Sequence, residues 1–129
     1  RKLKIGQILA KREEVVAETA DEKFMNRVME VVEANIPNEE FSLEVFAREM
    51  RVSRSVLNMR IQHIVGKSPM ELLRNARMQR AAQLLETDAY DIAQVGYMVG
   101  FSDPRYFSTS FKKQFGESPR SYMQNRRKT

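Results

Sequence analysis

The chain carries one pattern twice, and this internal duplication restricts its fold more than any other feature. SLEVFAREMRVS (residues 42–53) aligns with DIAQVGYMVGFS (91–102) at an offset of 49, and one inserted residue then moves the offset to 50. After that shift Leu57 pairs with Phe107, Ile61 pairs with Phe111, and GKSP (66–69) pairs with GESP (116–119). A repeat of this length indicates two copies of one supersecondary unit.

The spacing of apolar residues predicts that each copy is helical. Apolar residues recur at every third or fourth position and the alternation typical of strands is absent, so the pattern predicts an all-α fold. Gly66 indicates a helix end, while Ser68, Pro69 and Glu71 predict a capping box with proline at the first helical position. Four short polar residues are expected to act as N-caps: Asp21, Ser42, Ser53 and Ser68.

The helix expected at residues 69–87 changes its apolar face along its length, from Leu72, Leu73 and Ala76 to Met78, Ala81, Ala82 and Leu85. Because such a helix buries one side early and another side late, we interpret it as a connector between two packed units. We expect a first unit at about 42–66, a second at about 91–116 and a C-terminal helix at 119–127, within a domain spanning 21–129. Residues 1–20 are then a linker or the remnant of a preceding domain. Since the chain begins with Arg1, we expect it to be part of a longer protein.

Each copy reads as a helix-turn-helix unit. Both place a small residue, Ala47 or Gly96, in the middle of the first helix, where a second helix crossing at a steep angle would press against it. At the turn, Gly100 can adopt a positive φ freely, and Arg51 occupies the matching place in the first copy. The turn and the second helix, which we expect Ser53 or Ser102 to cap, complete the unit.

The second helix of each copy has one apolar face and one polar face. At about 100° per residue, the stripe Phe107, Ser110, Phe111 and Phe115 lies opposite Arg105, Ser108, Thr109 and Lys112. In the first copy the stripe Leu57, Ile61 and Ile64 lies opposite Ser55, Asn58, Met59 and Gln62. Such donors and acceptors suit base edges and phosphates. The alternative is an ordinary solvated surface.

The charge is unevenly distributed along the chain. The net charge of +5 divides into +5 over residues 1–12, −8 over 13–49 and +8 over 50–129. A basic C-terminal two-thirds is typical of a polyanion binder, although Lys and Arg also serve as solvated surface. The acids Glu39, Glu40, Glu44 and Glu49 are expected to form a solvated face kept off a polyanion. Carboxylate chemistry and a partner surface are the alternatives. Arg74, Arg77 and Arg80 are expected to contact phosphates or to pair with those acids.

Composition excludes several classes of site. The chain has no cysteine, which rules out disulfides and thiolate metal ligands. His63 is the single histidine, so we expect it to lie on the surface or beside phosphates rather than to bind metal or act as a base. No apolar run approaches the ~20 residues needed to cross a bilayer. We expect a cytoplasmic protein with no cofactor, no catalytic activity and no membrane contact.

A family resemblance adds to this reading. IAQVGYMVGFSDPRYFSTSFKKQFGESPRSYM (92–123) resembles the signature of the AraC/XylS family of bacterial transcription regulators, and the first repeat with RMQRAAQLL is similar to that family's N-terminal half-motif. The resemblance covers about residues 41–123. It implies a seven-helix domain that binds double-stranded DNA, with two helix-turn-helix units bridged by a rigid helix and each recognition helix in a major groove.

The resemblance also implies site residues. By position, the resemblance assigns base readout to one group of residues in each unit. The first group is Arg54, Ser55, Asn58, Met59 and Gln62, and the second is Pro104, Arg105, Ser108 and Thr109. Met59 and Pro104 depart from the long polar residues often found there, so we expect apolar contacts, for example to a thymine methyl. The candidates for contact with the DNA backbone are Ser53, Lys67, Ser68, Ser102, Lys112, Lys113, Ser118 and Arg120.

The segment DEKFMNRVMEVVEANIPNEEFSLEVFAREM (21–50) is similar to the output domains of hybrid two-component regulators, where a receiver precedes the DNA-binding module. We also expect RNA polymerase as a partner and a homodimer in the full-length protein. The similarity makes residues 1–20 a linker or the last helix of a receiver. The rival hypothesis is a helical interaction or dimerisation module that uses the acidic N-terminal helix. An enzyme is a third, for which the chain supplies almost no titratable cluster.

Overall fold

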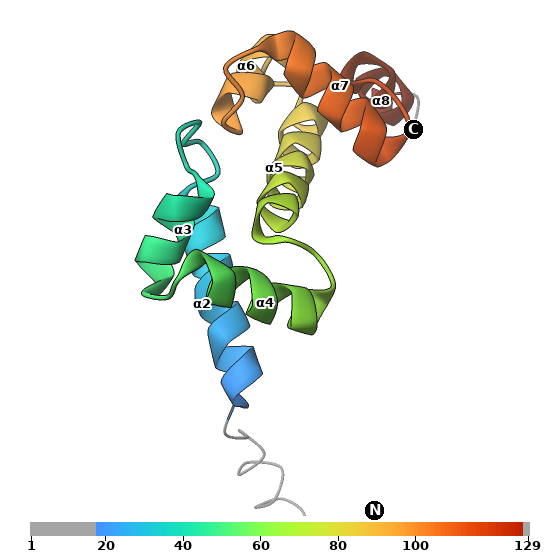
Figure 1. The fold of residues 1–129 in the computed structure, drawn as a ribbon. Coiled ribbons are helices and arrows are strands. Elements are labelled where there is room, and N and C mark those ends of the chain that lie inside the picture. The colour runs from blue at the N-terminus through green and yellow to red at the C-terminus, as the bar shows by residue number, and fades with distance from the viewer. Residues whose placement is uncertain (1–17, 128–129) are drawn as a thin grey trace, which may run out of the picture.

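The computed structural model describes residues 18–127, which form seven helices and no strand, so the all-α prediction is confirmed (Figure 1). The helices are α2 (Ala20–Ala34), α3 (Leu43–Met50), α4 (Arg54–Val65), α5 (Pro69–Glu86), α6 (Ile92–Met98), α7 (Pro104–Phe115) and α8 (Pro119–Arg127). Residues 1–17, which make up most of the expected linker, lie outside the described residues.

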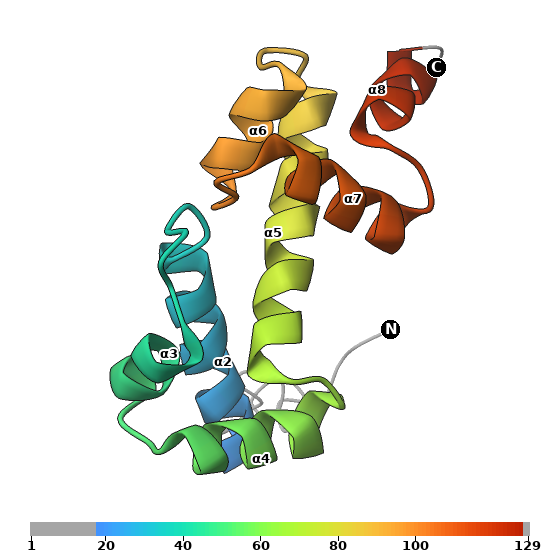
Figure 2. The same ribbon diagram turned by 45° about the horizontal axis from the view of Figure 1, so that its top comes forward.

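Two hydrophobic cores lie at the two ends of α5 (Figure 2). The first core joins α2, α3 and α4 to the start of α5, which contributes Leu73. The second joins α6, α7 and α8 to the end of α5, which contributes Met78, Ala81, Ala82 and Leu85. The change of apolar face along α5 therefore reflects burial against two different units, and α5 connects them.

The two helix-turn-helix units share the same turn. The N–H of Val52 donates to the carbonyl of Ala47 (3.1 Å), and the N–H of Phe101 donates to the carbonyl of Gly96 (2.9 Å). The residue before each donor is left-handed, with φ of 58° at Arg51 and 89° at Gly100. Because glycine adopts this conformation without a Cβ penalty while arginine does not, only the second turn is free of local strain.

Two caps and one capping box differ from the expected ones. α2 is capped by Thr19 rather than Asp21, and the Thr19 hydroxyl accepts from the Glu22 N–H (3.1 Å) while the Glu22 carboxylate accepts from the Thr19 N–H (3.3 Å). α7 is capped by Asp103 rather than Ser102, because the residue inserted in the second copy moves the helix start by one position. The Asp103 carboxylate accepts from the N–H of Arg105 (2.9 Å).

The third difference is at α5. Ser68 caps the helix and its Oγ accepts from the Glu71 N–H (3.2 Å), but the Glu71 carboxylate accepts from the Ser68 hydroxyl (3.5 Å) instead of from its N–H. Reciprocal capping boxes are formed instead at α2, between Thr19 and Glu22, and at α6, between Asp91 and Gln94 (2.8 and 2.9 Å).

Candidate nucleic-acid interface

The polar face of α4 is fully available to a ligand. The side chains assigned to base readout are exposed on one side of the helix, while Leu57 and Ile61 are completely buried on the other. Met59 is 62% exposed although it is apolar, so burial in the core does not explain its presence there. The exposed residues on this face are Arg54, Ser55, Asn58, Met59 and Gln62.

Arg54 is the one member of this face that the structure places in an ion pair. Its Nη1 lies 3.4 Å from the carboxylate of Glu44 on α3, and both side chains are mostly exposed. An exposed pair of this kind contributes roughly 0–1 kcal/mol. A phosphate or a guanine edge can therefore displace Glu44 at little cost.

On the polar face of α7 the side chains differ in how far they are exposed. The Arg105 side chain is 93% exposed and its Nε lies 3.6 Å from Asp103, so it can reach outward freely. The Thr109 hydroxyl donates to the carbonyl of Arg105 (3.0 Å), which leaves its lone pairs to accept from a ligand. Pro104 and Ser108 are half-buried, so a ligand would have to approach the helix more closely to contact them than to contact Arg105.

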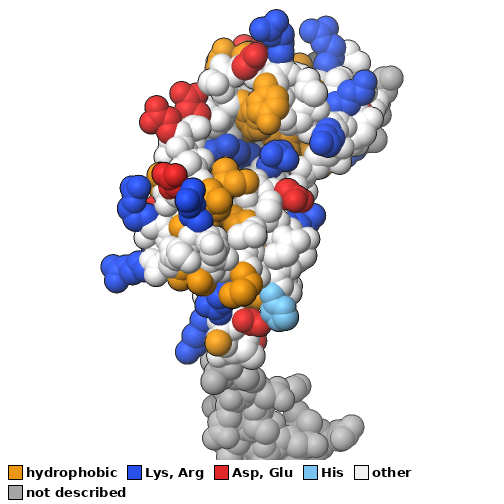
Figure 3. All heavy atoms as spheres, in the orientation of Figure 1, with side chains coloured by type: hydrophobic (Ala, Val, Ile, Leu, Met, Phe, Trp, Pro, Cys, Tyr) orange, Lys and Arg blue, Asp and Glu red, His pale blue; other side chains and the backbone are white. Residues whose placement is uncertain are grey.

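The candidates for backbone contact fall into two groups. Lys67, Lys112, Lys113 and Arg120 are exposed, and on the face shown in Figure 3 Lys and Arg side chains lie across the upper part of the molecule, where Figure 1 places α7 and α8. The serines are mostly caps: Ser53 accepts from the Val56 N–H (3.1 Å), and Ser118 accepts from the Ser121 N–H (3.1 Å). Ser68 is also engaged as a cap. A phosphate at the start of these helices would therefore be bound mainly by their free N–H groups.

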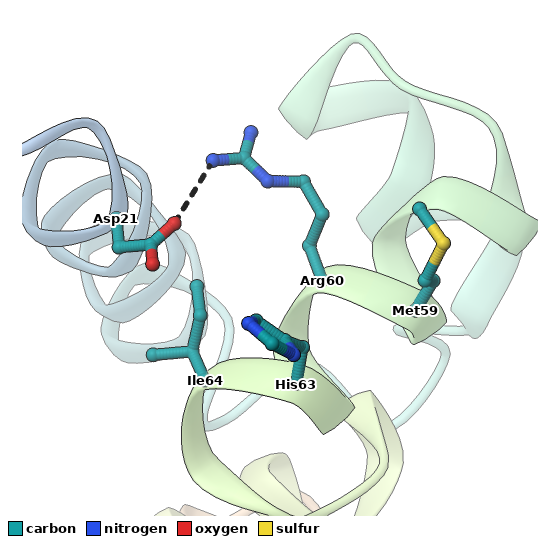
Figure 4. A pocket seen from close by; sticks show the side chains of 5 residues that line it. All are labelled: Asp21, Met59, Arg60, His63 and Ile64. Atoms are coloured by element: carbon teal, nitrogen blue, oxygen red, sulfur yellow. Dashed lines mark ion pairs between the residues drawn. The ribbon is translucent and has the colours of Figure 1, made fainter.

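Arg60 holds α4 against α2, an arrangement that the sequence did not indicate. Its guanidinium lies 3.9 Å from the centre of the Phe24 ring and 3.6 Å from the Asp21 carboxylate. Arg60, Asp21, Met59, His63 and Ile64 line a hollow of about 220 Å³ beside the exposed face of α4 (Figure 4). His63 is exposed there, in keeping with the surface role expected for it.

A polar groove of about 680 Å³ separates the first half of α5 from α7. The residues that line it include Glu71 and Arg74 of α5 and Tyr106, Thr109 and Lys113 of α7. Tyr106 is 57% exposed, so it does not belong to the buried aromatic stripe of its own helix. The sequence pattern gave no indication of this groove.

Arg77 contradicts its expected role. The sequence suggested contact with phosphates or with the acidic cluster, but the Arg77 guanidinium donates to the carbonyl oxygens of Ile36 (3.2 Å) and Asn38 (2.7 Å). Of the acids, Glu44 pairs with Arg54, and Glu49 accepts a weak bond from Asn35 (3.4 Å). All four acids of the cluster are exposed.

Comparison with known proteins gives consistent matches. A model of the helix-turn-helix domain family matches residues 46–125. Over 113 residues the chain is 41% identical to a protein named histidine kinase P4 from Formosa agariphila, an alignment that covers 88% of this chain and 8% of that protein. This chain therefore spans less than a tenth of that relative.

Solved structures of other proteins share the fold, among them the following two. One is a transcriptional regulator from Chromobacterium violaceum described by its AraC-type DNA-binding domain, with a TM-score of 0.74 and 30% identity over 81% of this chain and 92% of that one. The other is the DNA-binding domain of AdpA, a global transcriptional factor, in complex with a target DNA, with a TM-score of 0.71 and 29% identity over 78% of this chain and 93% of that one. Among residues 18–127, no helix combines the length and apolar character needed to cross a membrane.

Proposed function

We propose that this chain, which belongs to the AraC/XylS family of helix-turn-helix proteins, is a module of a transcription regulator that binds double-stranded DNA in a sequence-specific manner. The observation that carries the proposal is the pair of exposed polar faces on α4 and α7, each backed by a buried apolar stripe in its own core. The similarity to a domain that was solved on its target DNA supports it.

The arrangement suits two successive major grooves on one face of DNA. α5 has 18 residues and is therefore about 27 Å long. One recognition helix, α4, precedes its start, and the other, α7, packs beside it in the second unit (Figure 2). Successive major grooves on one face are about 34 Å apart. A single chain can then contact two unlike half-sites without palindromic DNA.

Each exposed side chain has a natural counterpart on DNA. Arg105 suits bidentate contact with guanine, Asn58 and Gln62 suit adenine, and Met59 suits the methyl group of thymine. Lys67, Lys112, Lys113 and Arg120 would neutralise phosphates and set the register without reading sequence. The module would act by binding alone, with no catalytic step.

The similarity to a protein named histidine kinase P4 supports a place for this module at the output end of a two-component system. On that view phosphorylation elsewhere in the full protein controls binding here. RNA polymerase, a second copy of the regulator and a cytoplasmic location belong to the same proposal.

Selection from random double-stranded DNA tests the proposal. We expect enrichment of two unlike short elements about one helical turn apart, and a preference over scrambled DNA that survives increasing salt. If Lys67, Lys112, Lys113 and Arg120 each neutralise one phosphate, they alone contribute a slope of about −3.6 to log affinity against log salt. Salt-sensitive binding with no preferred sequence would contradict the proposal and favour the rival interaction module.

A further inference from the structure

Arg77 joins the two helix-turn-helix units although it lies in neither. It stands near the middle of α5, and its Nε–H donates to the carbonyl of Ile36 (3.2 Å) while Nη2 donates to the carbonyl of Asn38 (2.7 Å). Both carbonyls belong to the loop that connects α2 to α3 in the first unit. In Figures 1 and 2 this loop extends away from its own unit toward α6 and the turn that follows it.

One residue of that loop, Ile36, is buried in the other unit's core. Ile36 is 3% exposed and packs in the cluster that contains Val99, Phe101 and Phe107 of the second unit. The loop therefore spans the gap between the two cores on the side of α5 where Arg77 lies. Arg77 holds it there by two hydrogen bonds from a charged donor, which are stronger than neutral ones.

Gly100 completes the junction. A Cβ at this position would lie 2.5 Å from the carbonyl oxygen of Ile36 and 3.0 Å from the Cζ of Arg77. The turn of the second unit, the loop of the first unit and the guanidinium of α5 are thus in direct contact. Gly100 also has a φ of 89°, so both its conformation and its surroundings require glycine.

We propose that Arg77 is a positioning residue: by holding the Ile36–Asn38 loop against Gly100, it sets the distance and angle between α4 and α7 and thereby the spacing of DNA half-sites that the chain accepts. The inference rests on the proposed function, because it concerns how two DNA-reading helices are aligned. Neither α4 nor α7 contains the residue. Without the Arg77 contacts, the two units would be joined by the continuous helix α5 and by the packing of Ile36 in the second core.

Half-site spacing is a sensitive readout because one added base pair moves the second half-site by about 3.4 Å and rotates it by about 35°. Two units in a fixed relationship cannot follow such a change, whereas two units that pivot on α5 can follow it in part. The experiment measures the affinity of the full chain for its selected site and for the same site with the spacer shortened or lengthened by one base pair. The proteins are the wild type, Arg77→Ala, Arg77→Lys, and Arg74→Ala as a charge-matched control from the exposed side of the same helix.

We expect wild type and Arg74→Ala to lose roughly 30-fold in affinity on either altered spacer, a penalty in the range of one mismatched base pair. Arg77→Ala should lose less than about 5-fold relative to its own affinity for the original spacer. Arg77→Lys retains one cationic donor and should fall between the two. A residue that only stabilised the fold would lower the active fraction on every DNA alike and leave these ratios unchanged.

Equal spacing penalties in wild type and Arg77→Ala would overturn the inference. If Arg77→Ala does not fold, as judged by helical circular dichroism, the comparison of Arg77→Lys with wild type decides in the same way, and Gly100→Ala should shift the preferred spacing by displacing the Ile36 carbonyl. A wild-type chain with no preferred spacing would instead contradict the proposed function. The two failures are therefore distinguishable.

Discussion

The Phe107 ring lies directly against Gly96, so that a Cβ on Gly96 would stand 3.1 Å from the Cγ and Cδ2 of that ring. Phe107 is completely buried and lies between Phe101 and Phe111, with ring centres 5.5 and 6.0 Å away. At the matching positions the first unit has Ala47 and Leu57, both buried in its own core. Relative to the first unit, the second unit therefore has a smaller residue in its first helix, Gly96, and a larger one in its second helix, Phe107.

Gly96→Ala should destabilise the protein by about 1 kcal/mol. Alanine gains about 1 kcal/mol of helix propensity over glycine, but crowding a packed ring costs typically 1–3 kcal/mol, and the flanking aromatics limit how far Phe107 can move. The measurement is the free energy of urea unfolding. The double variant Gly96→Ala with Phe107→Leu recreates the pair of the first unit, so a double-mutant cycle should show favourable coupling. A Gly96→Ala variant more stable than wild type would contradict this prediction and show that the Phe107 ring can move away from the added Cβ.

Asn58→Ala and Arg105→Ala should each change base preference in one half-site only. Losing a good base contact costs about 1–3 kcal/mol at the base pair concerned, while the other half-site should be read as before. Lys113→Ala should weaken binding to all sequences alike and reduce the salt slope by about one. Competition binding on single-substitution site libraries separates the two behaviours. Arg27→Ala on α2, whose side chain pairs with Glu30, is the control. Equal losses on every sequence for all three variants would contradict the assigned readout faces.

Met59 should read a methyl group. If its exposed side chain contacts thymine, replacing that thymine by deoxyuridine removes only the methyl and should weaken wild-type binding by about 0.8 kcal/mol, the value of one buried apolar carbon. Met59→Ala should be indifferent to the same replacement. Affinities of both proteins are compared for sites in which one thymine at a time is replaced. Equal sensitivity of wild type and variant at every thymine would assign the contact to another residue.

Tyr122 should make stability fall at alkaline pH. Burial, and then the hydrogen bond that its hydroxyl donates to Glu86 (2.6 Å), raise the pKa of Tyr122 above its ordinary value of 10.0. Because the folded pKa is the higher one, ionisation favours the unfolded chain: the stabilisation is fully present below the unfolded pKa and is lost as the pH rises through the folded pKa. Urea unfolding at about pH 8 and about pH 11 should show a steeper decline for wild type than for Tyr122→Phe. Tyr106→Phe, which alters an exposed ring, should decline as wild type does.

Periodicity and repeat alignment together predicted the helices and the two faces of α4 and α7, because those features depend on residues close together in sequence. The burial of α5 in two cores could also be predicted, because its apolar residues Leu73 and Leu85 lie on different faces of the helix. The caps were less predictable. Ser102 and Asp103 are both good N-caps, and only the position of the inserted residue decides between them.

The role of Arg77 could not be read from the sequence, because its partners are main-chain carbonyls that lie 39 and 41 residues away. Every residue has a main-chain carbonyl, so the residue types at positions 36 and 38 do not indicate that an arginine binds there. The same holds for Arg60, whose partners Asp21 and Phe24 are on another helix. Long-range contacts of single side chains are where the structure adds most to the sequence.

Protection of guanine N7 atoms from methylation on a selected DNA tests the central claim most directly, since these atoms lie in the major groove. The account predicts two protected windows on one face, about 10 base pairs apart, with Asn58→Ala altering only one window and Arg105→Ala only the other. A single protected window, or loss of both windows together in either variant, would contradict reading by two separate helices.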